Sequence, residues 1–184
     1  MAEEDLPKKY FAYTPCYRRE AGSYRTEERG MIRGYQFDKV ELVQYTKPED
    51  SDKAFEELVR KASNLVEKLG LHFQVSKLAA GDISHSMART YDIEVYIPSI
   101  GIYKEVSSAS NARDYQARRG HVRYRDNETK KTRFVHTLNA SGLATSRVFP
   151  AILEQYQQED GSVIVPEVLR PFMGGIEVLK PIKK

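Results

Sequence analysis

Two stretches near the start of the chain alternate polar residues with apolar or aromatic ones, and a polar segment separates them. The first stretch runs from Lys9 to Arg19 and the second from Met31 to Tyr45. The segment between them, Glu20 to Gly30, holds two glycines and five charged residues, a composition that a buried element does not carry. The pattern predicts a β-hairpin in which a polar loop joins an outgoing and a returning strand.

A helical period follows the hairpin. Apolar residues recur at a helical spacing from Ala54 to Leu69. We expect Thr46 to cap this helix at its start and Gly70 to end it. The segment is therefore predicted to be a long amphipathic helix that serves as scaffold.

Short alternating segments then predict an antiparallel sheet. Strands are expected at His72–Leu78, Thr90–Pro98, Gly101–Ser108 and Thr132–Leu138, with a loop at Ala79–Arg89 and a break at Asn139–Gly142. After the break we expect a helix over Leu143–Gln157, a short helical turn at Pro166–Leu169 and a frayed lysine-rich tail. The strands follow one another through short turns rather than crossover helices, so the predicted fold class is α+β, an antiparallel β-sheet flanked by helices.

Composition limits the class of protein. The 184 residues are enough for one domain over 1–184, and 40% hydrophobic with 30% charged residues is typical of a globular protein. A net charge of +3 is compatible with an RNA partner without requiring one. The single cysteine, Cys16, excludes an intramolecular disulfide and a cysteine-based metal cluster, and it favours a cytoplasmic location. No apolar run approaches the roughly 20 residues of a membrane-spanning helix, so no membrane partner is expected.

The predicted hairpin gathers charged residues that suit a nucleotide. Arg18, Glu20, Arg29 and Arg33 would lie close together on its arms and loop. Guanidinium groups bind phosphate oxygens in a bidentate way, and a carboxylate beside them can accept a hydrogen bond from an exocyclic amine. These residues predict a nucleotide site on a hairpin.

Two further groups leave alternatives open. Asp92, Glu94 and Glu105 would lie together on neighbouring strands, where carboxylates repel unless a cation joins them, and each could instead pair with a surface Lys or Arg. The stretch from Arg113 to Arg133 holds eight basic and three acidic residues. It is either a solvated loop or a surface that contacts RNA phosphates.

Three ordered motifs point to one enzyme family. They are CYRREAGSY with RGMIRGYQFDKVEL, then TYDIEVYIP with YKEVSSASN and QARRG, and finally HTLNASGLATSR with PEVLRPFMGG. From about Leu6 to Glu177 the chain resembles the class II aminoacyl-tRNA synthetases, and among them the seryl-tRNA synthetases. The resemblance implies a class II catalytic core without motif 1. It also implies ATP-dependent activation of serine to seryl-adenylate and transfer to tRNA(Ser) in the complete enzyme.

The resemblance implies an ATP site on the hairpin. Arg18 would grip the α-phosphate, and Glu20 would accept a hydrogen bond from the adenine amino group. Phe37 would stack on adenine, and Arg33 would reach the γ-phosphate. Arg147 would lie against ATP from the last motif, so Arg18 and Arg147 would be the catalytic residues.

A second implied part of the ATP site is the stretch from Glu105 to Ser108. Glu105 would carry Mg²⁺, which in proteins is bound by one or two carboxylates together with phosphate oxygens. Val106, Ser107 and Ser108 would complete the contacts with ATP. The implied cofactors are therefore ATP and Mg²⁺.

Serine and tRNA would bind beside the nucleotide. The resemblance implies that Glu41 holds the ammonium of L-serine and that Asn139 and Ser141 border its side chain. Ser23 and Tyr24 in the hairpin loop would face the acceptor end of tRNA(Ser). A homodimer is implied for a complete family member.

The family also carries segments that precede the matched region. They are a helical arm that binds the variable arm of the tRNA, motif 1 with most of the dimer interface, and a Thr-x-Glu loop that recognises serine. This sequence starts at motif 2, so we expect it to charge tRNA poorly by itself. Two alternatives stay open: a synthetase-like ligase that loads an amino acid onto an acceptor other than tRNA, and a non-catalytic nucleotide-binding paralogue.

Overall fold

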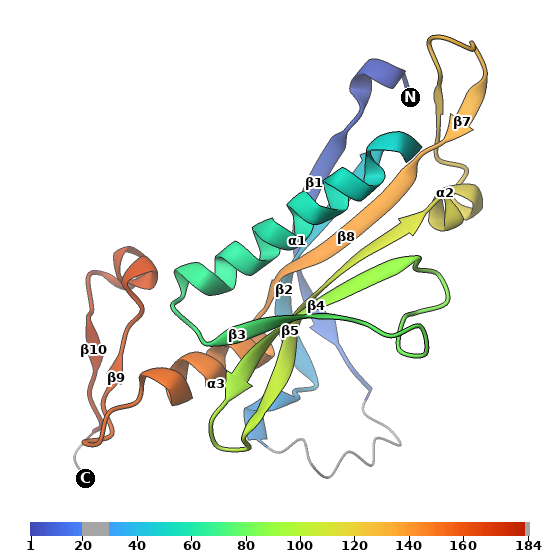
Figure 1. Cartoon of the computed structure of the whole chain (residues 1–184). Coiled ribbons are helices and arrows are strands. Elements are labelled where there is room, and N and C mark those ends of the chain that lie inside the picture. The colour runs from blue at the N-terminus through green and yellow to red at the C-terminus, as the bar shows by residue number, and fades with distance from the viewer. Residues whose placement is uncertain (20–29, 183–184) are drawn as a thin grey trace.

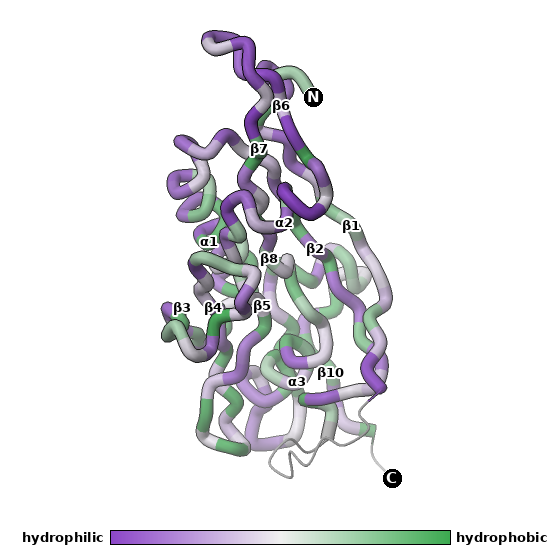
Figure 2. Tube along the Cα trace, turned by 90° about the vertical axis from the view of Figure 1, so that its right-hand side faces the viewer, coloured by the Kyte–Doolittle hydropathy of each residue, from purple (hydrophilic) through white to green (hydrophobic). Residues whose placement is uncertain are grey.

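The centre of the molecule is a six-stranded antiparallel sheet (Figure 1). The computed structural model describes residues 1–19 and 30–182. Across the sheet the strands are β1 (Lys8–Tyr17), β2 (Gln36–Thr46), β8 (His136–Ala144), β5 (Ile102–Arg113), β4 (Arg89–Ile97) and β3 (Phe73–Lys77). Figure 2 shows the same order, with β1 at one edge and β3 at the other. The predicted hairpin and the predicted α+β class are both confirmed.

Both long helices cover the same face of this sheet. The first, α1 (Ser51–Lys68), lies across β8 and β5, and the second, α3 (Thr145–Tyr156), packs on β4, β2 and β5. The core forms between them from α1, the inward residues of the strands and α3, with members that include Phe55, Leu58, Ile93, Val95, Leu138 and Val148. Residues of a strand alternate between its two faces, so the neighbours of these apolar residues point to the face that neither helix covers.

The start of α1 differs from the prediction. Thr46 does not cap the helix, because it is the last residue of β2 and its side chain is buried. A 3-10 turn at Pro48–Asp50 comes next, and Asp50 is the residue that precedes α1. Proline is well suited to the first position of such a turn, so Pro48 delays the helix. Gly70 ends the helix as predicted, with a φ of 67°.

The strand β8 continues through Asn139–Gly142, where a break was expected. Asn139 pairs with Val43 on one side and Ser110 on the other. At Gly142 the backbone of β8 lies close to the Leu42 side chain, since a Cβ there would lie 3.3 Å from Cγ of Leu42. The side chains of Asn139 and Ser141 therefore lie on the uncovered face of a central strand, whereas Ala140 between them is buried in the core. The helix begins later, at Thr145.

The basic stretch forms ordered secondary structure, so it is not simply a solvated loop, which was one of the two alternatives. It forms α2 (Tyr115–Arg119), β6 (Arg123–Arg125) and β7 (Thr132–Phe134). Burial of the Tyr124 ring within this stretch holds β6 and β7 against the domain. Contact with RNA phosphates at this surface stays a prediction.

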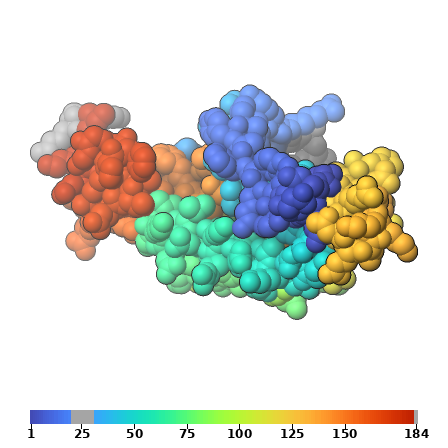
Figure 3. Space-filling view, turned by 90° about the horizontal axis from the view of Figure 1, so that it is seen from above, coloured from blue at the N-terminus to red at the C-terminus, as the bar shows by residue number. Residues whose placement is uncertain are grey.

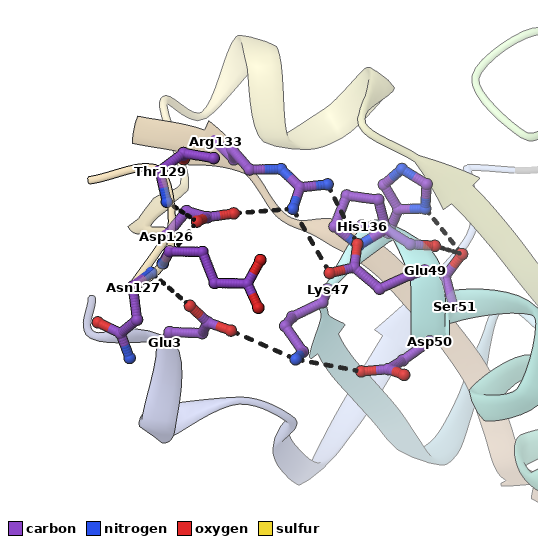
Figure 4. Close-up of polar contacts among 12 residues, drawn as sticks. Glu3, Lys47, Glu49, Asp50, Ser51, Asp126, Asn127, Thr129, Arg133 and His136 are labelled. Carbon is purple, nitrogen blue, oxygen red and sulfur yellow. Dashed lines mark hydrogen bonds and ion pairs between the residues drawn. The ribbon is translucent and has the colours of Figure 1, made fainter. Parts of the chain in front are cut away.

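The β6–β7 hairpin is tied to the N-terminal 3-10 turn (Glu3–Asp5) by a polar network (Figure 4). Arg133 donates to Glu49 at 3.1 Å and to Asp126 at 3.0 Å. Glu3 accepts from Lys47 Nζ at 3.3 Å and from the backbone N–H of Asn127. Figure 3 shows the N-terminal turn beside this hairpin at one end of the molecule.

The C-terminal segment projects at the other end of the molecule (Figure 3). It contains β9 (Val163–Ile164), a 3-10 helix at Glu167–Met173 and β10 (Val178–Leu179), and β9 pairs with β10. The predicted turn at Pro166–Leu169 is therefore part of a longer 3-10 helix, and the chain stays paired until just before its lysine-rich tail. Within the described ranges, no helix combines the length and apolar character that crossing a membrane requires.

Candidate functional site

Polar side chains gather on the sheet face opposite the two helices. They line a cavity of about 330 Å³ whose walls come from β2, β4, β5, β8 and the loop between β3 and β4. The lining includes Lys39, Glu41, Asp82, Met87, Glu105, Ser108, Asn139 and Ser141. The cavity exists because three neighbouring strands place polar residues at alternate positions on one face.

Glu41 is the centre of a hydrogen-bonded group inside this cavity. Its carboxylate accepts from Asn139 Nδ2 at 2.9 Å and from Ser141 Oγ at 3.3 Å. Glu41 pairs with Ser141 across β2 and β8, which explains why residues far apart in sequence meet here. Lys39 Nζ lies 3.2 Å from the same carboxylate. The structure thus brings together the three residues predicted to bind serine.

Arg147 and Glu105 form the second charged pair of the site. Arg147 Nη1 donates to the backbone carbonyl of Glu105 at 2.8 Å and lies 3.4 Å from its carboxylate. The first turn of α3 holds the arginine side chain, which is 12% exposed, while the Glu105 side chain is 43% exposed. The carboxylate therefore keeps an open side towards solvent, where a ligand can reach it.

The other two acidic residues have different partners. Glu94 accepts from Gln74 at 2.7 Å and from Ser76 at 2.8 Å, so its partners among the described residues include two neutral side chains of β3. One side-chain oxygen of Asp92 is buried and accepts no hydrogen bond from the residues that the structure describes. Burial raises the pKa of Asp92 to about 6, against a hydrogen bond with Ser108 that lowers it, and the charges of Glu105 and Glu94 add to the rise.

The described residues contain no ready-made metal centre. No group of three or more His, Cys, Asp or Glu side chains in 1–19 and 30–182 is arranged to hold an ion. Glu105 and Asp92 with the Ser108 hydroxyl nevertheless form a small set of oxygen donors. A cation at this place would need further oxygens from a ligand, which is the usual situation for Mg²⁺ bound with phosphates.

The hairpin positions Arg18 and Phe37 at the edge of the site. The guanidinium carbon of Arg18 lies 4.8 Å from the centroid of the Phe37 ring, and the backbone N–H of Arg18 donates to the Tyr35 carbonyl at 2.8 Å. Asp38 and Thr145 exchange two hydrogen bonds of 3.1 Å, which fixes the start of β2 to the start of α3. Phe37 and Arg147 are thereby held on adjoining elements.

For several residues predicted from the sequence, the structure shows no direct approach of the side chain to the cavity. Arg33 follows the 3-10 turn Gly30–Ile32 and is partly buried. Val106 and Ser107 are buried, and Ser107 Oγ donates to the carbonyl of Ser141 at 2.6 Å, so a nucleotide could meet these two only through the backbone. Glu20, Ser23 and Tyr24, together with Arg29, lie outside the described residues.

Lys39 and Met87 are among the cavity residues that were not predicted from the sequence. Lys39 was overlooked although it stands between Phe37 and Glu41 at a strand period of two. Met87 comes from the loop between β3 and β4, which folds over the cavity because Met87 N–H donates to Ser84 and Ala88 N–H donates to Asn111. No local pattern in the loop signals this contact.

A larger cavity, of about 680 Å³, lies beside Phe37 where η2 (Gly30–Ile32) and the start of β2 meet α3. Its lining is mainly apolar and includes Met31, Val148, Phe149 and Ile152. Asp38 is the one charged residue among the described residues of this lining. The smaller cavity gathers Lys39, three carboxylates and several hydroxyl and amide groups, so it is the better candidate for chemistry that involves charged groups.

Comparisons with known proteins agree with this placement. Residues 1–156 match the model of the family described as tRNA synthetase class II core domain (G, H, P, S and T). The chain is 72% identical over 174 residues to serine–tRNA ligase 2 of Clostridium acetobutylicum, covering 95% of this chain and 41% of the relative. It is 55% identical over 184 residues to serine–tRNA ligase of Cellvibrio japonicus, covering 100% of this chain and 43% of the relative.

Two solved structures have the same fold. Seryl-tRNA synthetase from Pyrococcus horikoshii, complexed with ATP, has a TM-score of 0.94 and 41% identity, covering 100% of this chain and 41% of that chain. Cytoplasmic serine–tRNA ligase from Naegleria fowleri, in complex with AMP, has a TM-score of 0.91 and 34% identity, covering 100% of this chain and 43% of that one. The chain thus spans about two fifths of the length of the relatives it matches.

Proposed function

Because the chain belongs to the class II tRNA synthetase core family, we propose that it is the part of a seryl-tRNA synthetase catalytic domain that binds ATP and serine. The complete protein would activate serine to seryl-adenylate and transfer it to tRNA(Ser). A homodimer and a cytoplasmic location stay predictions.

One observation supports this proposal most directly. Glu41 accepts hydrogen bonds from Asn139 and Ser141 on the open face of the sheet. A carboxylate in such a group can bind an ammonium, and the amide and hydroxyl beside it can satisfy a small hydroxylated side chain. Serine presents these groups together, so it fits the chemistry of the walls.

The main contribution of the chain to this reaction would be to position the two substrates. In adenylate formation the serine carboxylate attacks the α-phosphate and pyrophosphate leaves. The carboxylate is already nucleophilic, so catalysis depends on alignment and on neutralising negative charge rather than on a strong general base. Arg18 and Arg147 are the cations proposed to meet the phosphates, and Glu41 would hold the serine ammonium.

The residues on the open face also fit Mg²⁺. Glu105 would hold the ion with Ser108 beside it, because both side chains line the polar cavity. When bound with ATP, Mg²⁺ would neutralise phosphate charge. Glu105 also accepts from Arg147, so the carboxylate orients that arginine whether or not an ion is present.

Calorimetric titration of the 184-residue chain with ATP, with and without Mg²⁺, tests this proposal. We expect ATP to bind, and Mg²⁺ to tighten binding by about tenfold, the ratio that corresponds to 1.4 kcal/mol. Glu105→Gln keeps the shape of the side chain and should lose most of this response to Mg²⁺. Glu159→Gln, at an exposed position outside the cavity, is the matched control and should respond like the parent. Absence of ATP binding by the parent would contradict the proposed function.

A further inference from the structure

Lys39 lies between two residues with proposed roles on the same face of β2. Residues two apart on a strand point to the same side and are separated by about 7 Å. Phe37, Lys39 and Glu41 therefore form a row along the strand. Lys39 and Glu41 both line the polar cavity, together with Glu105 across the sheet.

The order of this row corresponds to the order of groups in an aminoacyl-adenylate. Such a molecule has an adenine at one end, an ammonium at the other, and an anionic acyl-phosphate linkage between them. If adenine stacks on Phe37 and the ammonium binds Glu41, as the proposed function requires, then the linkage lies next to Lys39.

Lys39 can offset the negative charge of the cavity lining. Its described lining contains three carboxylates, from Glu41, Asp82 and Glu105, and Lys39 is the one Lys or Arg in that lining. Carboxylates this close would repel an incoming phosphate or carboxylate. A cation in the middle of the row offsets that repulsion at the point where the anionic linkage would lie.

The Lys39 ammonium already has a partner that a substrate would replace. It lies 3.2 Å from Oε2 of Glu41, and its side chain is 29% exposed. The register of β2 against β8 shifts here, because the two steps from Lys39 to Glu41 face three steps from Ala144 to Ser141. The extra residue lies in β8, so β2 keeps the alternation that places Lys39 and Glu41 on one face. A flexible four-carbon stem lets the ammonium move without a change in the strand.

We infer that Lys39 is a further substrate-binding residue. Its ammonium pairs with the Glu41 carboxylate in the free protein and moves to the anionic linkage of the adenylate when substrate binds. The incoming substrate ammonium then takes its place on Glu41. This inference rests on the proposed function, because it uses the proposed positions of adenine and of the serine ammonium. No bond is made or broken by the exchange, and the pairing of charges is complete before and after it.

Binding measurements on two ligands test this role. Adenosine carries no charged linkage, whereas seryl-sulfamoyl-adenosine carries an anionic linkage and an ammonium. Each would be titrated into the parent, Lys39→Met, Lys39→Arg and, as a control on the exposed face of α1, Lys68→Met. Lys39→Met removes the charge and keeps the stem, whereas Lys39→Arg keeps the charge.

We expect Lys39→Met to weaken the binding of seryl-sulfamoyl-adenosine by about tenfold or more, because charge-assisted contacts are stronger than neutral ones. The affinity for adenosine should stay within about twofold of the parent. Lys39→Arg should recover most of the loss, and Lys68→Met should behave like the parent. An equal loss for both ligands would show that Lys39 only supports the fold, and an unchanged affinity for both would also overturn the inference. In either case the parent still binds its ligands and the proposed function stands, whereas a parent that binds neither ligand would contradict both.

Discussion

The guanidinium of Arg18 lies over the ring of Phe37, with 4.8 Å between its central carbon and the ring centroid. A cation in this position is held by the ring quadrupole. The same ring is the proposed stacking surface for adenine. If adenine stacks on the face that Arg18 covers, ATP binding requires the guanidinium to leave the ring, and the phosphates are the natural destination for its charge.

This exchange predicts a difference between ATP and adenosine. Arg18→Ala should weaken ATP binding by roughly 2–4 kcal/mol, the scale for losing a charged partner. The same substitution should leave adenosine binding unchanged or slightly stronger, because the ring is then free. Titration calorimetry with both ligands measures the difference, and Arg60→Ala on the exposed face of α1 is the control. Equal losses for the two ligands would show that Arg18 does not act on the phosphates.

Asp126 gives a prediction about pH. The backbone N–H of Thr129 and the Arg133 guanidinium lower the pKa of Asp126 from 3.8 to about 2 (Figure 4). A carboxylate with a lowered pKa stabilises the fold above its ordinary pKa, and this contribution is lost as the pH falls towards the folded-state value. Asp126→Asn should therefore lower the melting temperature at pH 6, and the gap between parent and variant should narrow between pH 4 and pH 2. A gap that stays constant over that range would contradict this account.

Substitutions at two glycines can distinguish the cost of backbone strain from the cost of steric overlap. Gly70 and Gly174 have nearly the same left-handed φ, 67° and 65°, but only Gly70 lies against a side chain, that of Tyr156. Tyr156 Oη donates to the Leu69 carbonyl at 2.8 Å and so locks the end of α1. We expect Gly174→Ala to cost about 1 kcal/mol from strain alone, and Gly70→Ala to cost roughly 2–4 kcal/mol because the tyrosine must also move. Urea unfolding of both variants measures the free energies, and equal costs would exclude the tyrosine contact as a determinant.

The sheet could be predicted because its signals are local. Alternation in β2 and β4 and the helical spacing from Ala54 to Leu69 identified the main elements, and short connections identified the antiparallel class. The predicted element boundaries were wrong where contacts between residues distant in sequence determine the structure. The residues Asn139 to Gly142 look like a break in the strand, yet they lie within β8, where Asn139 to Ser141 pair with β2 and Asn139 also pairs with β5.

The candidate site shows the same division. Glu41, Asn139 and Ser141 were predicted from motifs, and the structure places them within hydrogen-bonding distance. Met87 could not be predicted, because its position over the cavity depends on a backbone hydrogen bond between Ala88 and Asn111 on a different strand. Lys39 was predictable in principle from its spacing, since it lies two residues before Glu41 on β2 and both line the cavity.

The most direct test of the central claim is the affinity of the chain for two adenylate analogues that differ by one hydroxyl. Seryl-sulfamoyl-adenosine presents the adenine, the ammonium and the serine hydroxyl together, and its alanyl counterpart lacks the hydroxyl. We predict that the seryl analogue binds more tightly by about tenfold or more, because the alanyl analogue would leave the polar groups of Asn139 and Ser141 without a partner. Equal affinity for the two analogues, or binding of neither, would contradict a serine and ATP site on the open face of this sheet.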